Sequence, residues 1–493
     1  MLFNSFDFIW LFPIVFIIYY SVVFLFSRKR ADCKIENIVL LLLSYLLYIK
    51  FNPVYVLLLL GVTLVTYIFA ILIENSENRR KQHLLTAGIC LGILPLVIFK
   101  YYDFIHENLN ALLGYIGVNV GLPGLNWALP IGISFFTFQA IGYLIDVYYQ
   151  KIQAERSWLD YMLFVSFFPQ IASGPISKAQ DLLPQIKQRK NFDYAKAVEG
   201  LKWLLWGMFL KVVLADRLGS SISSFGIESL NGGMTLFFSV LYSFQIYGDF
   251  AGYSFMAMGV GKIMGFDLIN NFRRPYFSQS ITEFWHRWHI SLSIWLRDYI
   301  YIPLGGSRCS KPRNYFNIFV TFLVSGIWHG ANWTFILWGT LHGLFQIIEK
   351  ALGLNKVTSS GIVKVVRIFV NFVILTFLWI FFRNDTIHDA WIQIEKIFCD
   401  YNYNLSLSWQ VFFFIIVALS IVIGKDFVDE FNIKRLQFFS SKCVFVRWAA
   451  YLICMILILL MGVFDAAQFI YVNFCYEKVY LEDSSFLFSS SHY

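Results

Sequence analysis

The chain has 493 residues, of which 58% are hydrophobic, 19% are aromatic and only 14% are charged. Soluble domains usually carry about 25% charged residues, so this composition excludes a soluble globule of the same length. The net charge of +8 would suit nucleic-acid binding, but the basic residues lie in short segments between apolar runs. That distribution is typical of the loops of membrane proteins, so we expect the lipid bilayer, and no nucleic acid, as a partner.

Apolar runs long enough to enter or cross a bilayer recur along the whole chain. The first, 8–26, has no charged segment before it and no small-residue cleavage site after it, so it is expected to be a retained span. The pattern predicts an all-α, polytopic membrane protein with about 11 spans, at 8–27, 37–50, 53–73, 84–99, 127–149, 197–216, 233–260, 315–350 (broken or tilted), 365–382, 409–424 and 446–470.

One further apolar segment, 160–176, is interrupted by the sequence FPQIASGP. Pro169, Gly174 and Pro175 disfavour a continuous helix there. Irregular backbone cannot face lipid, so the segment is expected to form a re-entrant turn that is shielded by protein.

Basic clusters predict the orientation of the chain in the membrane. They occur at 28–34, 79–81, 178–190, 273–274 and 308–313. All fall on one side if the N-terminus lies outside the cytoplasm and each run through 260 crosses once. The loop 177–196 is then cytoplasmic. With no repeat or linker, residues 1–493 are expected to form a single transmembrane domain.

The first candidate for chemistry is His329, in the segment VSGIWHGANWTFILWGTLHG at 324–343. It lies roughly 21 Å along a helix from Tyr315, which predicts a position deep in the bilayer. On a continuous helix, Ser325, Asn332 and Trp333 would share its face. A core histidine bonded between helices and a general base that deprotonates a hydroxyl both fit this spacing.

Flanking glycines add a packing prediction. Gly326 and Gly330 bracket His329 at the small-xxx-small spacing that lets another helix approach closely.

The second candidate region, 273–306, predicts an amphipathic helix from Thr282 to Asp298 that lies at the membrane interface. A capping-box pattern at Ser280 and Glu283 and a Glu283–Arg287 pair support its start. Trp285 and His289 would fall on the apolar face, where His289 can point inward. His286, Arg287 and Arg297 fit an interfacial role.

The third candidate is Asp249, a single carboxylate in the apolar stretch YSFQIYGDFAGYS at 242–254. It is expected either to pair with a buried arginine or histidine or to help bind a donor or acceptor.

Metal ligation is not expected, because the histidines are not clustered as in membrane di-iron hydroxylases and the seven cysteines show no paired spacing. No bound cofactor is expected either. These residues leave two functions open, acyl transfer and a proton-coupled transporter or glycan flippase that uses His329 and Asp249 as a relay.

The longer motifs break this tie by resemblance. Two successive segments resemble the core of the membrane-bound O-acyltransferase (MBOAT) family, and more closely its alginate O-acetyltransferase-like bacterial branch. They are FRRPYFSQSITEFWHRWHISLSIWLRDYIYIPLGGSR and FLVSGIWHGANWTFILWGTLHG. Three further segments resemble the same family, namely LPIGISFFTFQAIGYLIDVYY, FVSFFPQIASGPI and YSFQIYGDFAGYS. The resemblance covers most of 1–350, and 351–493 would add further membrane helices.

The resemblance implies a ring of tilted helices around a central funnel, with His329 as the catalytic residue and His289 as a second active-site polar residue. Asp249, Asn332, Trp285, Ser325 and Arg297 are the supporting candidates.

The resemblance also implies the reaction and its location. An acyl group, expected to be acetyl, would pass from a cytosolic thioester such as acetyl-CoA across the cytoplasmic (inner) membrane. The acceptor would be an exported polysaccharide, reached directly or through an extracytoplasmic SGNH-type esterase-like partner.

Overall fold

The computed structural model describes residues 3–27, 33–50, 52–118, 121, 123–125, 127–226, 229–358, 361–405 and 407–464. Helices dominate these residues and no strand occurs among them, which confirms the all-α prediction. Two predictions lie outside the described residues, the basic cluster Arg28, Lys29 and Arg30 and the end of the run 446–470.

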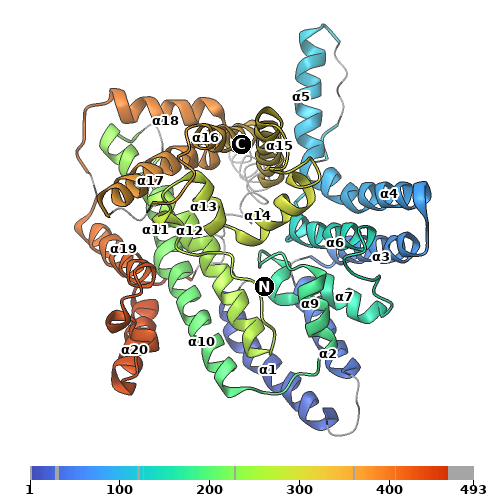
Figure 1. The fold of residues 1–493 in the computed structure, drawn as a ribbon. Coiled ribbons are helices and arrows are strands. Elements are labelled where there is room, and N and C mark those ends of the chain that lie inside the picture. Colours follow the sequence, from blue (N-terminus) through green and yellow to red (C-terminus); the bar gives the residue numbers. More distant parts are fainter. Residues whose placement is uncertain are drawn as a thin grey trace, which may run out of the picture.

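The N-terminal region contributes helices α1 to α6, which pack mainly against one another. Helix α3 contacts both α4 and α6, whereas α5 projects from the body of the molecule (Figure 1). The bounds are α1 (Phe6–Ser27), α2 (Lys34–Ile49), α3 (Tyr55–Glu74), α4 (Asn78–Leu96), the π-helix η1 (Val97–Tyr101), α5 (Tyr102–Tyr115) and α6 (Ile133–Tyr148).

The interrupted segment that the sequence predicted is also interrupted in the structure. Helix α7 (Trp158–Ser166) is followed by the single turn α8 (Phe168–Ile171) and then by irregular chain up to α9 (Ala179–Lys187). Every residue from 163 to 177 is buried, so protein shields this irregular backbone as the prediction required.

The centre of the molecule is α12 (Gly232–Ile263), a helix of 32 residues that is buried along most of its length. It packs closely along α10 (Tyr194–Met208), which continues into the π-helix η2 (Phe209–Ala215) and α11 (Asp216–Ser223). The two backbones approach at glycines, since a Cβ on Gly207 would lie 2.6 Å from the carbonyl oxygen of Gly252.

The predicted helix from Thr282 to Asp298 is wrong as a single element. After the short turn η4 (Pro275–Phe277), the chain forms α13 (Ile281–Arg287), α14 (Ile290–Leu296) and the π-helix η5 (Arg297–Tyr301). By contrast, the predicted break within 315–350 is confirmed, because α15 (Lys311–His329) and α16 (Trp333–Ala351) are separate helices.

The C-terminal helices cover the other side of the central pair. Helix α18 contacts α12, whereas α19 and α20 contact η2. Their bounds are α17 (Gly361–Arg383), α18 (Ile387–Cys399), α19 (Trp409–Glu430), η6 (Lys434–Leu436), η7 (Phe438–Ser440) and α20 (Val444–Met461).

Within the residues that the structure describes, six helical segments are long and apolar enough to cross a bilayer, which supports a multi-pass membrane protein. They are Asp7–Leu25, Tyr55–Glu74, Arg79–Tyr115, Gly361–Arg383, Trp409–Glu430 and Val444–Met461. The count of about 11 spans stays a prediction.

Candidate active site

His289 lies at the break between α13 and α14, with a left-handed backbone at φ 42° and ψ 54°. Its side chain is 0% exposed, and neither ring nitrogen has a hydrogen-bond partner among the described residues. The imidazole contacts three aromatic rings, those of Phe250 (4.6 Å between centroids), Trp328 (5.9 Å) and Phe135 (6.3 Å). The histidine therefore points inward through a backbone break rather than through the helix face expected from the sequence.

The helix before His289 begins with the predicted cap. The hydroxyl of Ser280 accepts a hydrogen bond from the Glu283 N–H at 3.0 Å, which confirms the N-terminal half of the capping box. The Glu283 carboxylate accepts from the N–H of Gln279 at 2.7 Å, one residue earlier than a standard box requires. The start of α13 is thus fixed by these hydrogen bonds and by the carboxylate of Glu349, which accepts from the N–H groups of Ile281 and Thr282.

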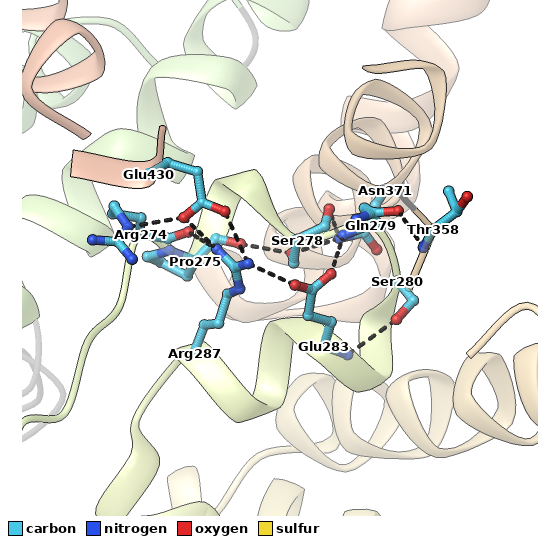
Figure 2. A network of polar contacts seen from close by, with 10 residues as sticks. All are labelled: Arg274, Pro275, Ser278, Gln279, Ser280, Glu283, Arg287, Thr358, Asn371 and Glu430. Atoms are coloured by element: carbon cyan, nitrogen blue, oxygen red, sulfur yellow. Dashed lines mark hydrogen bonds and ion pairs between the residues drawn. The ribbon is translucent and has the colours of Figure 1, made fainter. Parts of the chain in front are cut away.

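An ion-pair network fixes the other end of α13 (Figure 2). The predicted Glu283–Arg287 pair is confirmed at 2.6 Å. Arg287 also donates to Glu430 at the end of α19, and Arg274 donates to the same carboxylate at 2.9 Å. Because Arg287 is two residues before His289, this network anchors the chain where it turns into the site.

His329 is the last residue of α15 and is 6% exposed. Its ring contacts those of Trp328 (4.9 Å), Trp338 (4.9 Å) and Phe382 (5.4 Å). Both histidines therefore contact Trp328. We call the rings of Phe135, Phe250, Trp328, Trp338 and Phe382 the aromatic layer.

The predicted close helix approach occurs beside His329. A Cβ on Gly339 of α16 would lie 2.7 Å from the Cα of Gly326, so the backbones of α15 and α16 touch there.

Asn332 and Trp333 do not share a face with His329, so that part of the sequence reasoning is wrong. Gly330 is extended (φ −165°), which ends α15 at His329. Asn332 instead caps α16, because its side chain accepts from the Thr334 N–H at 3.1 Å and donates to the carbonyl of Asp385 at 2.6 Å. The sequence signal that could have shown this cap is an asparagine directly before an apolar run, which is a common start of a helix.

Ser325 and Trp285 lie near His329 but contact different neighbours. Ser325, one turn earlier in α15, is 0% exposed, and its hydroxyl has no hydrogen-bond partner within the described part of the chain. Trp285 donates to Nδ1 of the buried His342 at 3.2 Å, and its ring lies 5.7 Å from that of Trp338. Trp285 thus supports the aromatic layer from behind.

Asp249 is paired, with a lysine rather than the arginine or histidine expected. The ammonium of Lys211 in η2 lies 2.5 Å from Asp249 and 2.6 Å from Asp216, and all three side chains are buried. We call this group the lysine–aspartate triad. In this triad two carboxylates lie around one cation in the protein interior, which is the geometry of a structural ion cluster.

A cavity of about 450 Å³ lies next to the aromatic layer. Phe138 and Trp295 line it, and their rings stack at 3.9 Å. Phe138 also contacts Trp328 at 5.4 Å, so one aromatic wall separates the cavity from the rings around the histidines. Lys178 and Arg297 line the same cavity, so Arg297 belongs to it rather than to the histidine site.

Asp298 fixes these two basic residues in place. Its carboxylate accepts from Arg297 Nε at 2.7 Å and from the Lys178 ammonium. Partial burial raises the pKa of this carboxyl, but the two hydrogen bonds and the positive charges outweigh burial, so the pKa lies below its ordinary value.

Several site residues were missed by the sequence reasoning. The aromatic partners Phe250, Trp338 and Phe382 carry no signal of their own in a chain with 53 Phe and 15 Trp. Lys100 and Lys211 did carry one, because each is an ionisable residue within an apolar run. Within the described residues, no group of three His, Cys, Asp or Glu side chains is arranged to hold a metal ion.

Comparison with known proteins gives the family that this chain matches. The model of the membrane-bound O-acyltransferase family matches residues 2–384. The chain is 38% identical to the probable alginate O-acetylase AlgI of Pseudomonas aeruginosa, over 80% of this chain and 75% of that protein. It is 35% identical to the peptidoglycan O-acetyltransferase of Helicobacter pylori, over 79% and 78%. Identity to the teichoic acid D-alanyltransferase of Streptococcus thermophilus is 30%, over 58% and 73%.

Proposed function

The chain belongs to the membrane-bound O-acyltransferase family, and from this membership we propose that it transfers an acetyl group from a cytosolic thioester to a hydroxyl of an exported polysaccharide. That it is a multi-pass membrane O-acyltransferase follows from the family and from the apolar helices. The observation that carries the finer proposal is the pair of buried histidines, His289 and His329, that contact the same indole of Trp328.

In the proposed reaction, His329 is the general base. A hydroxyl oxygen attacks the thioester carbonyl while the imidazole of His329 accepts the hydroxyl proton. The C–S bond of the resulting tetrahedral intermediate then breaks, and His329 returns the proton to the departing thiolate. A neutral His289 donates a hydrogen bond to the oxyanion. Its strained, buried position suits a pre-organised donor.

The cavity beside the aromatic layer is the proposed donor side. Its basic residues Lys178 and Arg297 are the proposed contacts for the phosphates of acetyl-CoA or of another phosphopantetheine thioester. The phosphates would compete there with Asp298, which pairs with both, and would lie beside the lining carboxylates of Asp181 and Asp267. In the orientation proposed from the basic clusters, the N-terminus lies outside the cytoplasm and 177–196 lies inside, so this cavity opens toward the cytosolic pool of thioesters.

The acceptor is proposed from the names of the relatives, which are O-acetylases of the exported polymers alginate and peptidoglycan. Such acceptors lie outside the cytoplasmic membrane. We propose that this chain passes the acetyl group across that membrane, to the polysaccharide or first to an extracytoplasmic esterase-like partner.

Sided proteoliposomes test this proposal. Radiolabelled acetyl-CoA is supplied on the side of loop 177–196, and acetylated polysaccharide is measured on the other side, with and without the partner. The wild-type protein should transfer label, and His329→Ala should lose at least about 100-fold in rate. His388→Ala, at an exposed histidine of α18, is the control. A His329→Ala rate above about a tenth of wild type would exclude the general-base role.

A further inference from the structure

Lys100 is the single lysine or arginine in the long helical run after Lys81, up to Tyr115. It lies in the π-helix η1, within the segment Arg79–Tyr115 that is long and apolar enough to span a bilayer. A charged side chain in such a segment costs at least about 2.5–3.5 kcal/mol on insertion scales, so it is retained for a partner or a role. The proposed reaction does not use it.

The partner of Lys100 is the end of α15. Its ammonium donates to the carbonyl oxygen of Trp328 and lies 5.5 Å from the centre of the Trp328 ring. The next residue, Tyr101, donates its hydroxyl hydrogen to the carbonyl oxygen of Ile327 at 2.8 Å. Two consecutive side chains of η1 therefore hold the two carbonyls that precede His329.

These two carbonyls need partners from outside α15. The last carbonyls of a helix have no N–H partner within it, and α15 ends at His329. A lysine at a helix C-terminus satisfies such carbonyls and interacts favourably with the negative end of the helix dipole. The carbonyl of Trp328 also belongs to the peptide bond whose nitrogen is that of His329, so Lys100 holds the peptide plane from which the histidine projects.

Lys100 also contacts the helix whose first turn packs against His289. Its ammonium lies 3.3 Å from the hydroxyl of Ser134, in the first turn of α6. The next residue of that turn is Phe135, whose ring stacks against His289. One side chain thus ties the end of α15 to the start of α6.

We infer that Lys100, together with Tyr101, is a positioning residue that fixes His329 in its reactive orientation by capping α15. The inference rests on the proposed function for its consequence in catalysis, but the cap itself does not depend on it. A misplacement of a catalytic group by about 1 Å can cost about 100-fold in rate, so the loss of this cap is expected to be visible in kcat.

The kinetic test compares Lys100→Met, which keeps the apolar stem, with Lys100→Arg, which keeps a charged donor. Lys100→Met should lower kcat by about 10- to 100-fold and change the KM of the thioester by less than about twofold. Lys100→Arg should lose less. Lys81→Met is the matched control and should leave kcat unchanged. Lys81 in α4 also lies over an aromatic ring, Tyr148, at 5.5 Å, but within the described part of the chain its side chain forms no hydrogen bond to α15.

A merely structural lysine is distinguished by combining variants. If Lys100 acts through His329, Lys100→Met should lower the residual rate of His329→Ala by less than about twofold, because the positioned group is already gone. The same 10- to 100-fold loss in both backgrounds would overturn the inference. A kcat of Lys100→Met equal to that of wild type would overturn it too.

Hydrogen exchange keeps the cap separate from the reaction. Backbone amides in the peptide 324–334 should exchange faster in Lys100→Met than in wild type or Lys81→Met, whether or not acetyl transfer is detected. Unchanged exchange there would overturn the cap. If Lys100→Met exchanges faster but the wild-type protein shows no acetyl transfer, the cap is retained and the proposed function is refuted. Should Lys100→Met fail to fold, Tyr101→Phe tests the same cap, because it removes one of its hydrogen bonds. It is expected to lower kcat and to speed exchange in 324–334, each by less than Lys100→Met.

Discussion

Adjacent residues of α12 contact two buried polar centres of opposite character. Asp249 belongs to the lysine–aspartate triad, where the Lys211 ammonium lies 2.5 Å from Asp249 and 2.6 Å from Asp216. Phe250 packs its ring at 4.6 Å from His289, whose ring nitrogens have no hydrogen-bond partner among the described residues. One centre is a cluster of ion pairs, and the other is an imidazole enclosed by aromatic rings.

This difference predicts that stability depends on one centre and chemistry on the other, although both contact adjacent residues of α12. Buried charges must be paired, so the triad is expected to hold η2, α11 and α12 together. An uncharged imidazole among aromatic rings costs less to bury, and its polar atoms remain available to a bound substrate. Variants in the triad should therefore change folding, whereas variants at His289 should change the rate.

The largest effect is expected in the triad. Lys211→Met leaves two buried carboxylates without their cation and should lower the free energy of unfolding by about 3–5 kcal/mol. Chemical or thermal unfolding in detergent measures it. Lys262→Met, at the other end of α12, removes partly exposed pairs with Glu199 and Asp267 and should cost less than about 1 kcal/mol.

A charge-free triad sharpens this result. The triple variant Lys211→Met, Asp216→Asn, Asp249→Asn removes all three charges, so it should be more stable than Lys211→Met alone. Wild-type stability of the single variant would show that the triad does not hold these helices together.

The next effect concerns His289. His289→Ala should lower kcat by less than His329→Ala, and His289→Asn should retain more activity than His289→Ala, because an amide still donates a hydrogen bond to an oxyanion. Both asparagine and glycine tolerate the positive φ of this position. His289→Gly is therefore the control that keeps the backbone and lacks the donor. Equal activity of the Asn and Gly variants would argue against an oxyanion donor at this position.

The smallest effect lies outside both centres, at the part-buried pair between Lys178 and Asp298. Because the pKa of Asp298 is lowered in the folded protein, its contribution to stability is complete above the ordinary pKa of about 3.9 and is lost as the pH falls through the folded value. Asp298→Asn should cost about 1 kcal/mol at pH 7, and the difference from wild type should shrink below about pH 4. Asp181→Asn, at an exposed carboxylate of the same cavity, is the control substitution.

The sequence predicted features that depend on local patterns. The apolar spacing predicted α12 and α17, and the Ser280–Glu283 pattern predicted the start of α13. Gly326 predicted the close contact with the next helix, because a missing side chain has the same consequence in any fold.

Features that depend on distant contacts were not predicted. Residues 282–298 are compatible with one helix, but the chain on either side of the left-handed His289 is bonded to residues outside this segment. Asn271 accepts from the N–H groups of Ile290 and Ser291, and Glu430 pairs with Arg287 from 143 residues away. Likewise, the partner of Asp249 lies 38 residues earlier in the chain. Nothing in the local pattern around either residue specifies these pairings.

Three π-helical segments, η1, η2 and η5, have a further consequence for how this chain tolerates change in length. Each contains a lysine or arginine that the folded protein uses, namely Lys100, Lys211 and Arg297. A π-helical turn accommodates an additional residue within a helix. Deleting one residue there would let ordinary helical hydrogen bonds form and would leave the two flanking stretches of helix close to their present register, whereas a deletion in regular α-helix would rotate everything beyond it by about 100°. The backbone at the π-helical turn itself would be rebuilt, so such a deletion is expected to move Lys100, Lys211 or Arg297 away from its partners while the helix beyond keeps its place.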